Sequence, residues 1–420
     1  MPLYDYQGDI LEVSGNVSEP LENDLPVVGL FGTLPTLKAD GEYPIRLFYK
    51  SATDEFEDYA TAKVQGDSSQ RYPKKNFTIK LFSDSGRSKK DKRLFKDWDK
   101  KRNKFVLKAN WIDHSHARNI VNARLWGNVV KSRSDYTSLP SELRDGNLAI
   151  DGFPVKVYNN GIYLGIYTFN LPKDAMYGLD AEIDENCIIQ SEGDVDDDSL
   201  LFRTSTMNGK WADELHDDMP SIIETKWTAF LAFNNESTDT VFHNNLSNYM
   251  DVPSLIDMHI FVQVGCIVDN IGKNQTFFTY DAKKWYTGMY DMDGTWGLAP
   301  FQPDVRGWLS PQSVFQNDYN AYRVTGKTNK LHDRLSTLFH NDIISRYSEL
   351  RNGPLSEDAI LTEFEHFMQT IPPYVYEEDY AETTGGGAYT DIPLAETNNI
   401  FQIRQFVKDR LLYVDSVMSN

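Results

Sequence analysis

The sequence predicts an α+β fold in which strands fill the first part of the chain and helices the last part. Residues 44–64 and 151–170 alternate apolar with polar side chains, which is typical of strands that bury one face. Towards the C-terminus, apolar residues recur instead at helical spacing over 331–350, 355–371 and 394–418. We therefore expect a β-rich part followed by a helical part.

Length and composition favour a globular protein with an ample core. The chain has 420 residues, of which 40% are hydrophobic and 13% aromatic. Its 62 acidic and 42 basic residues give a net charge of −20, which disfavours nucleic-acid binding and favours a basic protein partner. No apolar segment resembles a signal peptide or reaches membrane-spanning length, so we expect cytoplasmic synthesis and no membrane contact. We expect an N-terminal extension over 1–40, a β-rich lobe over 41–180 and a helical lobe over 181–420.

A strand is expected near 27–31, and a hairpin is expected over 151–170. Asn160-Gly161 at the centre of this hairpin is a favoured two-residue turn. Cys187 and Cys266 lie far apart in apolar surroundings, so we expect small buried residues rather than a disulfide or a metal site.

A small polar loop between two strands is the first candidate for binding chemistry. Gly66, Ser68 and Ser69 lie in this loop, where backbone N–H groups and hydroxyls are suited to contact phosphate oxygens. In the strand that follows, Thr78 and Lys80 point to the face opposite Phe77, Ile79 and Leu81. A lysine on a sheet beside a phosphate loop is one requirement of phosphoryl transfer. The alternative is an exposed hairpin with a solvated lysine.

A strand over 105–108 and a helix follow. Asp113 or Ser115 is a suitable N-cap for this helix, and Arg118 in its first turn is suited to pair with a carboxylate or a phosphate. His114 and His116 are two residues apart and would point to different faces of a helix, which disfavours a metal-binding pair.

The stretch 255–297 carries the second set of candidate residues. An apolar run over 256–268 predicts a buried helix, and two short aromatic strands over 277–280 and 285–290 predict a hairpin with its turn at 281–284.

Acidic and amide residues flank this hairpin. Asp269 ends the apolar run, Asn274 follows five residues later, and the second strand ends in Asp291-Met292-Asp293. Phosphoryl transfer needs a carboxylate that accepts the hydroxyl proton, and it needs oxygen ligands for Mg²⁺. Protein kinases place the Asp and Asn of their catalytic loop at this same spacing. The alternative is that these residues only cap helices and turns, where Asp is common.

Taken together, these segments resemble the spore coat protein H (CotH) kinase family, an atypical branch of the protein-kinase-like fold. The resemblance covers the chain from about residue 40 to its end. Three groups of residues carry it: Gly66 to Ser69 with the segment 73–81; the segment 107–119 with the Gly-x-Tyr hairpin at 160–167; and Asp269, Lys273-Asn274 and Asp291-Met292-Asp293 before Gly297.

The resemblance implies a two-lobed fold with a nucleotide cleft, the use of ATP with Mg²⁺ or Mn²⁺, and phosphoryl transfer to Ser or Thr of partner proteins. It implies that Asp269 takes the substrate proton and that Asn274 is a metal ligand. Asp291 or Asp293 would hold metal, and we favour Asp293 because Gly294 frees the backbone that follows it. The implied phosphate-side residues are Gly66, Ser68, Ser69, Lys75, Lys80 and Arg118, with Lys80 or Lys75 as the phosphate-holding lysine.

Departures from the family pattern support a second hypothesis. Family members usually carry Arg, Trp and Glu where this chain has Gln65, Tyr290 and a residue near Asn170, and the missing Glu removes a candidate partner for the nucleotide-site lysine. Residues 2–10 also resemble the N-termini of tail and baseplate proteins in phages of Gram-positive bacteria. The chain could then be a non-catalytic structural protein of a virion or spore coat, with tail, baseplate or coat proteins as partners. No arrangement typical of a glycosidase or protease is present.

Overall fold

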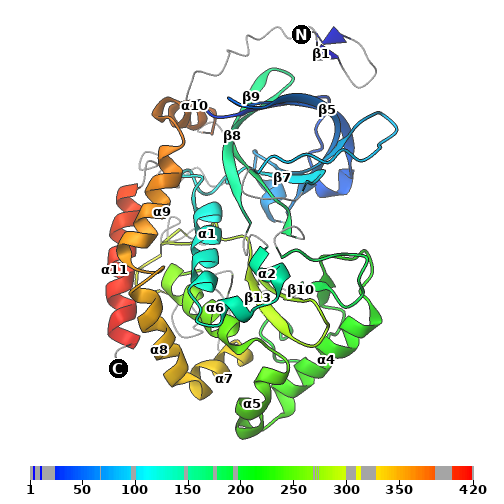
Figure 1. Ribbon diagram of the computed structural model, residues 1–420. Helices are drawn as coiled ribbons and strands as arrows, with labels where there is room; N and C mark the ends of the chain where they lie inside the picture. The colour runs from blue at the N-terminus through cyan, green and yellow to red at the C-terminus, as the bar shows by residue number, and fades with distance from the viewer. Residues whose placement is uncertain are drawn as a thin grey trace. The chain divides into compact units, whose positions relative to one another are not determined.

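The computed structural model describes most of the chain, which divides into two compact units (Figure 1). Unit 1 comprises Met1–Ile120, Asp151–Pro172 and Glu365–Asn398, and unit 2 comprises Val121–Ile150, Lys173–Phe364 and Asn399–Asn420. The described residues are 3–4, 10–11, 24–66, 68–95, 101–145, 150–173, 177–192, 197–267, 270, 272, 274–298, 309–313, 328–383 and 400–418.

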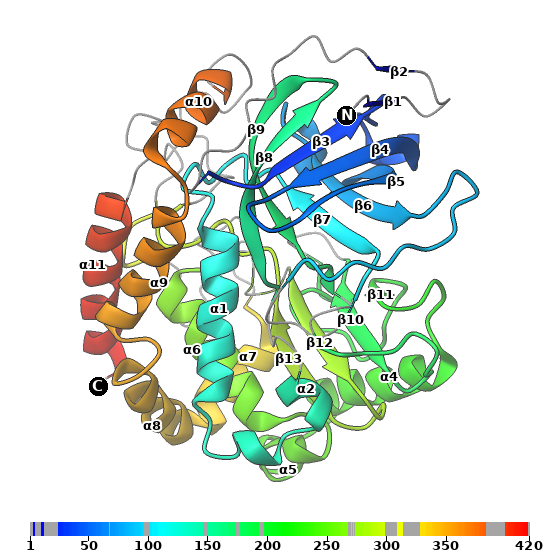
Figure 2. The same ribbon diagram turned by 45° about the horizontal axis from the view of Figure 1, so that its top comes forward.

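A closed barrel forms the centre of unit 1, with the strand order β3-β4-β5-β6-β7-β9-β8 (Figure 2). All neighbouring strands are antiparallel except β3 and β8, which pair in parallel and close the barrel. The strands are β3 (Val27–Phe31), β4 (Tyr43–Lys50), β5 (Glu55–Gln65), β6 (Asn76–Phe82), β7 (Lys104–Lys108), β8 (Gly152–Asn159) and β9 (Ile162–Asn170). A separate two-stranded pair, β1 (Leu3–Tyr4) and β2 (Ile10–Leu11), precedes them.

Alternation along the strands explains which side chains form the core of this unit. In β6, Phe77, Ile79 and Leu81 are buried while Thr78 and Lys80 are partly exposed, as the sequence predicted. Helix α10 (Pro373–Thr383) packs on β9 and is the only described α-helix that lies wholly in unit 1.

Unit 2 combines a four-stranded antiparallel sheet with helices. The sheet has the order β11-β10-β12-β13, built from β10 (Cys187–Ser191), β11 (Trp211–Asp213), β12 (Gln275–Thr279) and β13 (Trp285–Met289). Helix α6 (Val252–Gly265) is buried along nearly its whole length and packs on β13, α8 and α11. The other described helices are α1 (Arg118–Lys131, which begins in unit 1), α2 (Ser141–Asp145), α4 (Ser221–Glu236), α5 (Asp239–Asn245), α7 (Lys330–Leu338), α8 (His340–Arg351), α9 (Glu357–Gln369, which ends in unit 1) and α11 (Ile400–Met418).

The mixed α+β content is confirmed, whereas the closed seven-stranded barrel is a correction to the expected kinase-like, two-lobed fold with its β-rich N-terminal lobe. Closure depends on the parallel pairing of β3 with β8, whose partner residues are more than 120 positions apart, for example Val27 and Lys156. The predicted helix over 331–350 is two helices that meet at Phe339. The predicted lobe border near 180 stays a prediction, and the unit borders above are the ones that packing gives.

Both cysteines are buried and free, as expected. Among the described residues, no helix combines the length and the apolarity that crossing a bilayer requires.

Candidate functional site

The open end of the β12–β13 hairpin in unit 2 brings together the amide and two of the carboxylates that the sequence predicted. Gln275 pairs with Met289, so Asn274 and Tyr290 follow at the same end, next to Asp291 and Asp293. Asn274 is buried, while the two aspartates are partly exposed. Asp269 lies outside the described residues, so its predicted role in proton transfer is not tested.

Two residues at this hairpin end adopt the left-handed backbone conformation. The angle φ is 59° at Asn274 and 55° at Asp291. Asn and Asp tolerate this region better than other residues, although it still costs about 1 kcal/mol each. Such conformations gather at functional sites when neighbouring contacts hold them in place.

Asn270 supplies such contacts. Its side-chain Nδ2 donates to the backbone oxygen of Asn274 and to that of Tyr290, each at 3.1 Å. The Asn270 side chain is fully buried. A single amide therefore joins the loop that follows α6 to the end of β13.

A chain of hydrogen bonds runs from Asn270 into the core of unit 2. Gln275 Nε2 donates to the backbone oxygen of Asn270 at 2.6 Å and to His332 Nε2 at 2.8 Å, and His332 Nδ1 lies 3.0 Å from His259 Nδ1. Because His332 accepts at Nε2, its proton must lie on Nδ1 and point to His259. Burial lowers the pKa of His259 to about 4 and holds the pKa of His332 well below its ordinary value, so both rings are neutral at physiological pH.

Asn122 on α1 holds the segment that carries the aspartates. Its Nδ2 donates to the Met292 oxygen at 3.1 Å and to Thr295 Oγ1 at 2.8 Å, and its Oδ1 accepts from Trp296 Nε1 at 2.8 Å. Trp296 is fully buried with φ at 52°. The backbone between Asp291 and Trp296 is thus fixed from both sides by buried amide groups.

The residues at the hairpin end suit a hard divalent cation. Carboxylate and amide oxygens are the ligands that Mg²⁺ prefers, and Asn274, Asp291 and Asp293 present such oxygens from one end of the hairpin. Within the described ranges, no three His, Cys, Asp or Glu side chains form a metal-binding group. A metal here would therefore depend on the amide oxygen of Asn274 besides the two aspartates.

In unit 1 the predicted phosphate loop joins β5 to β6. Gly66 has φ at 93°, and a Cβ on it would lie 2.0 Å from Ser69 Oγ, so glycine is required there. Asn76 Nδ2 donates to Ser69 Oγ at 3.3 Å. Ser68 begins a short 3₁₀ helix, Ser68–Arg71. The loop lies between two strands, as the sequence predicted, and its contact with phosphate stays a prediction.

The two candidate lysines make different contacts. Lys75 Nζ donates to the backbone oxygens of Gln70 (2.7 Å) and Tyr72, which ties this lysine to the loop itself. Lys80 Nζ forms an ion pair with Glu42 on the partly exposed face of β6. Partial burial disfavours the charged form of Glu42, but the hydrogen bond and charge of Lys80 lower the pKa of Glu42 below its ordinary value.

Arg118 pairs with a carboxylate, which is one of its two predicted partners. Its Nη1 lies 2.5 Å from Asp113 Oδ1, and both side chains are buried. Asp113 Oδ2 also accepts from the backbone N–H of Arg118 at 2.8 Å, and Ser115 Oγ accepts from that of Ala117 at 3.3 Å. Both predicted capping residues thus accept at the start of α1. A phosphate contact of Arg118 stays a prediction.

A buried charged cluster in unit 1 was not predicted. Asp379 on α10 lies 3.0 Å from Lys74 Nζ and 2.9 Å from His116 Nε2, and it accepts from the backbone N–H of Ile166 at 2.7 Å. Lys74 and His116 therefore both contact Asp379, which lies on a helix far away in sequence. Lys74 was not among the predicted site residues, and His116 was considered only as a metal ligand. No local sequence pattern indicates that Lys74 or Asp379 has a buried partner. Asn270 in unit 2 was also missed, although its place directly after the candidate Asp269 is a signal that could have identified it.

A pocket of about 860 Å³ opens at one end of the barrel in unit 1. This volume is typical of small-molecule sites. Its lining includes Lys74 and Lys75, whose ammonium groups are engaged as described above, but none of Gly66, Ser69 and Lys80. The lining residues are Gly32, Thr33, Leu34, Pro35, Thr36, Pro73, Lys74, Lys75, Phe77, Trp111, Asn159, Asn160, Tyr163, Leu164 and Tyr167.

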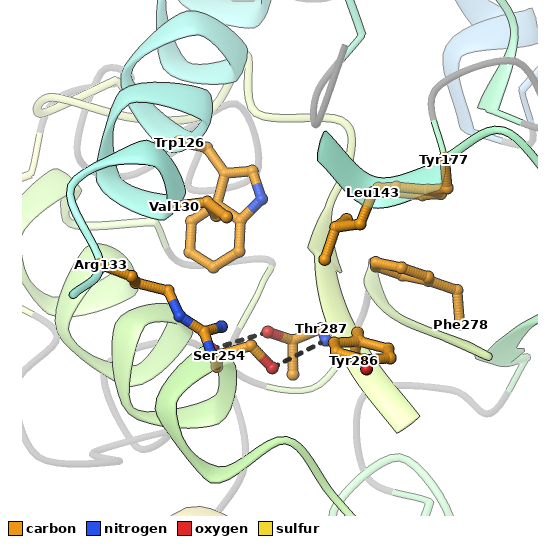
Figure 3. Close-up of a pocket in the computed structure, with 9 residues that line it drawn as sticks. All are labelled: Trp126, Val130, Arg133, Leu143, Tyr177, Ser254, Phe278, Tyr286 and Thr287. Atoms are coloured by element: carbon orange, nitrogen blue, oxygen red, sulfur yellow. Dashed lines mark hydrogen bonds between the residues drawn. The ribbon is translucent and has the colours of Figure 1, made fainter. Parts of the chain in front are cut away.

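A second, much smaller cavity lies in unit 2 between α1, α6 and the sheet (Figure 3). Arg133 borders it, and Thr287 on β13 is fastened to Ser254 on α6 by two hydrogen bonds, of 3.2 and 2.7 Å. Its volume of about 10 Å³ has room for about one water molecule. This cavity is a packing feature rather than a ligand site.

Comparison with known proteins identifies a family for nearly the whole chain. A family model described as CotH kinase protein matches residues 62–414, which include both groups of candidate residues. No curated protein matches the chain.

Proposed function

Because the chain belongs to the CotH kinase family, we propose that it transfers the γ-phosphoryl group of ATP to Ser or Thr hydroxyls of a partner protein. The observation that carries this proposal is the hairpin end in unit 2, where Asn274 and Asp291 occupy strained backbone conformations fixed by one buried amide. A site prepared in this way suits the rigid placement of charged ligands that phosphoryl transfer needs.

In this proposal the hairpin end binds Mg²⁺ or Mn²⁺ through Asn274, Asp293 and Asp291, and the metal neutralises charge on the triphosphate. Asp269 accepts the proton of the substrate hydroxyl. The net charge of −20 favours a basic or Ser/Thr-rich protein as substrate.

The phosphate-holding lysine of the proposal is Lys80. Kinases keep their nucleotide-site lysine in an ion pair with a glutamate, and the family's Glu near Asn170 is absent from this chain. Glu42, directly before β4, makes that kind of pair with Lys80 in this protein. Lys75 is the second choice because its ammonium group already serves two carbonyl oxygens of its own loop.

The test is phosphate transfer from γ-labelled ATP to the protein itself and to a casein-like protein, with Mg²⁺ or Mn²⁺. We expect Asp293→Asn to lower transfer by at least about 100-fold, since electrostatic groups of this kind contribute factors of this size. Asp281→Asn is a matched control, because Asp281 lies at the turn of the same hairpin and accepts from the N–H groups of Lys283 and Lys284. Wild-type transfer no greater than that of Asp293→Asn would refute the proposal.

A non-catalytic protein of a virion or spore coat is the alternative function. It predicts that ATP with Mg²⁺ leaves the melting temperature unchanged, whereas a kinase is stabilised by its bound nucleotide.

A further inference from the structure

We infer that Asn270 is a positioning residue that sets the spacing between the two metal-holding segments of the proposed kinase site. This inference rests on the proposed function for its catalytic meaning, but the geometry stands by itself. Asn270 donates one N–H to the oxygen of Asn274 and the other to that of Tyr290, which directly precedes Asp291.

Only a primary amide can make this bridge at such a short reach. The two carbonyl oxygens need two donors from one group, and the amide Nδ2 has two N–H bonds, whereas a carboxylate has none. The opposite orientation of the amide would turn Oδ1 towards both oxygens and is therefore unfavourable. Among the described residues Oδ1 has no hydrogen-bond partner, so the side chain acts there through the two bonds that it donates.

The bridge acts on the two strained peptides of the site. The carbonyl oxygen of Asn274 accepts one hydrogen bond of the bridge, and the carbonyl oxygen that accepts the other, that of Tyr290, belongs to the peptide that leads into Asp291. Without the bridge, both residues would relax towards the more favourable right-handed or extended regions. The positions of their side-chain oxygens would then change.

Buried groups behind Asn270 hold it in place. Gln275 Nε2 donates two hydrogen bonds, one to the backbone oxygen of Asn270 and one to His332 Nε2. His332 in turn contacts His259 on the buried helix α6. The donated hydrogen bonds therefore diverge from Gln275, one towards His332 and α6 and the other towards Asn270 and the hairpin end. Outer contacts of this kind are worth about 10- to 100-fold in metal affinity at known metal sites.

The decisive variant is Asn270→Asp in the full chain, which keeps the shape and replaces both donors by acceptors. Asn234→Asp is the matched control, because Asn234 is equally buried in unit 2 and donates to a carbonyl, that of Phe202, rather than to the hairpin end. Mn²⁺ affinity in the presence of ATP is measured by water-proton relaxation. We expect a loss of about 10-fold or more for Asn270→Asp and little change for the control.

Hydrogen–deuterium exchange supplies a measurement that does not depend on activity. We expect Asn270→Asp to raise exchange in peptides covering both 271–276 and 289–294, and the control to raise it in neither. Exchange that rises in one segment only, or equally in both variants, would overturn the inference. If Asn270→Asp does not fold, Gln275→Met removes the support behind Asn270, and we expect it to produce the same pattern at smaller amplitude.

The two proposals can fail separately. Wild-type protein that binds Mn²⁺ with ATP, together with an unchanged Asn270→Asp variant, refutes the positioning role and leaves the kinase proposal standing. Wild-type protein that binds neither refutes the kinase proposal, and the exchange comparison alone then decides whether Asn270 fixes the two segments.

Discussion

The carboxylate of Asp379 lies 3.0 Å from the ammonium nitrogen of Lys74, although 305 residues separate them along the chain. The two side chains are only 4% and 5% exposed. Burial disfavours the charge of Asp379, but Lys74 and His116 hold its pKa well below the ordinary value. Helix α10 is therefore fastened to the barrel of unit 1 by a buried charge rather than by apolar packing alone.

Asp379→Asn should destabilise the protein strongly, because it leaves the ammonium group of Lys74 buried without a counter-charge. Removing one partner of a buried ion pair costs about 3–5 kcal/mol. The free energy of unfolding in urea measures this loss. Glu55→Gln is the control, since the Lys50–Glu55 pair is 3.7 Å long and well exposed. It should change stability by less than about 1 kcal/mol.

The double variant Lys74→Met/Asp379→Leu separates charge from packing. Replacing both partners by apolar side chains of similar size removes the unpaired charge, so it should recover part of the stability lost in Asp379→Asn. A double variant as unstable as the sum of the two single changes would show that the pair is not what fastens α10.

Local patterns predicted the elements well. The apolar run at 256–268 overlaps the buried helix α6, which begins earlier and ends at Gly265, and the Asn160-Gly161 turn joins β8 to β9 as expected. The hairpin of β12 and β13 also lies where aromatic and β-branched residues indicated. These features depend on side chains within a few residues of one another, which sequence periodicity records directly.

Long-range pairings could not be predicted in this way. The parallel pairing of β3 with β8 and the contact of Asp379 with Lys74 each join residues more than 100 positions apart. A lysine next to another lysine, or an aspartate on a polar helix, carries no local signal of such a partner. Asn270 escaped notice for a related reason, since its role is visible only once Asn274 and Tyr290 lie side by side.

Gly165→Ala should be much more damaging than Gly41→Ala. Both glycines have positive φ, at 105° and 78°, so both variants strain the backbone. A Cβ on Gly165 would lie 2.2 Å from Asp379 Oδ1 and 2.8 Å from Lys74 Nζ, whereas one on Gly41 meets nothing within 4 Å. We expect about 1–3 kcal/mol for Gly41→Ala and at least about 2 kcal/mol more for Gly165→Ala.

Thermal and urea unfolding of the two variants provide the comparison. The difference between them isolates the contact with the Asp379–Lys74 pair from the backbone strain that they share. Equal losses would mean that α10 can shift away from β9 at little cost, contrary to a tightly fastened helix.

His259 should make the protein less stable as the pH falls from about 6.5 to about 4. Burial lowers the pKa of His259 to about 4 in the folded state, from an ordinary 6.5. Between these values the unfolded chain binds a proton at this residue and the folded chain does not, so the free energy of unfolding decreases as the pH falls. The full effect is about 3 kcal/mol, and it is absent above pH 6.5.

The comparison of wild type with His259→Gln tests this, because glutamine can accept a hydrogen bond from His332 without titrating. Asp257 acts in the opposite direction: burial raises its pKa to about 6, so its contribution favours the folded state as the pH falls. The wild-type pH profile alone therefore mixes these two effects with those of other buried groups, such as His332, whose pKa is also lowered by burial. The difference between the two urea-unfolding profiles removes the contribution of Asp257, and we expect this difference to grow by about 3 kcal/mol between pH 7 and pH 4. If the free energies of unfolding of wild type and His259→Gln instead differ by the same amount at every pH, His259 is protonated in the folded state at low pH as readily as in the unfolded state. The hydrogen bond between neutral His259 and His332 would then be wrong.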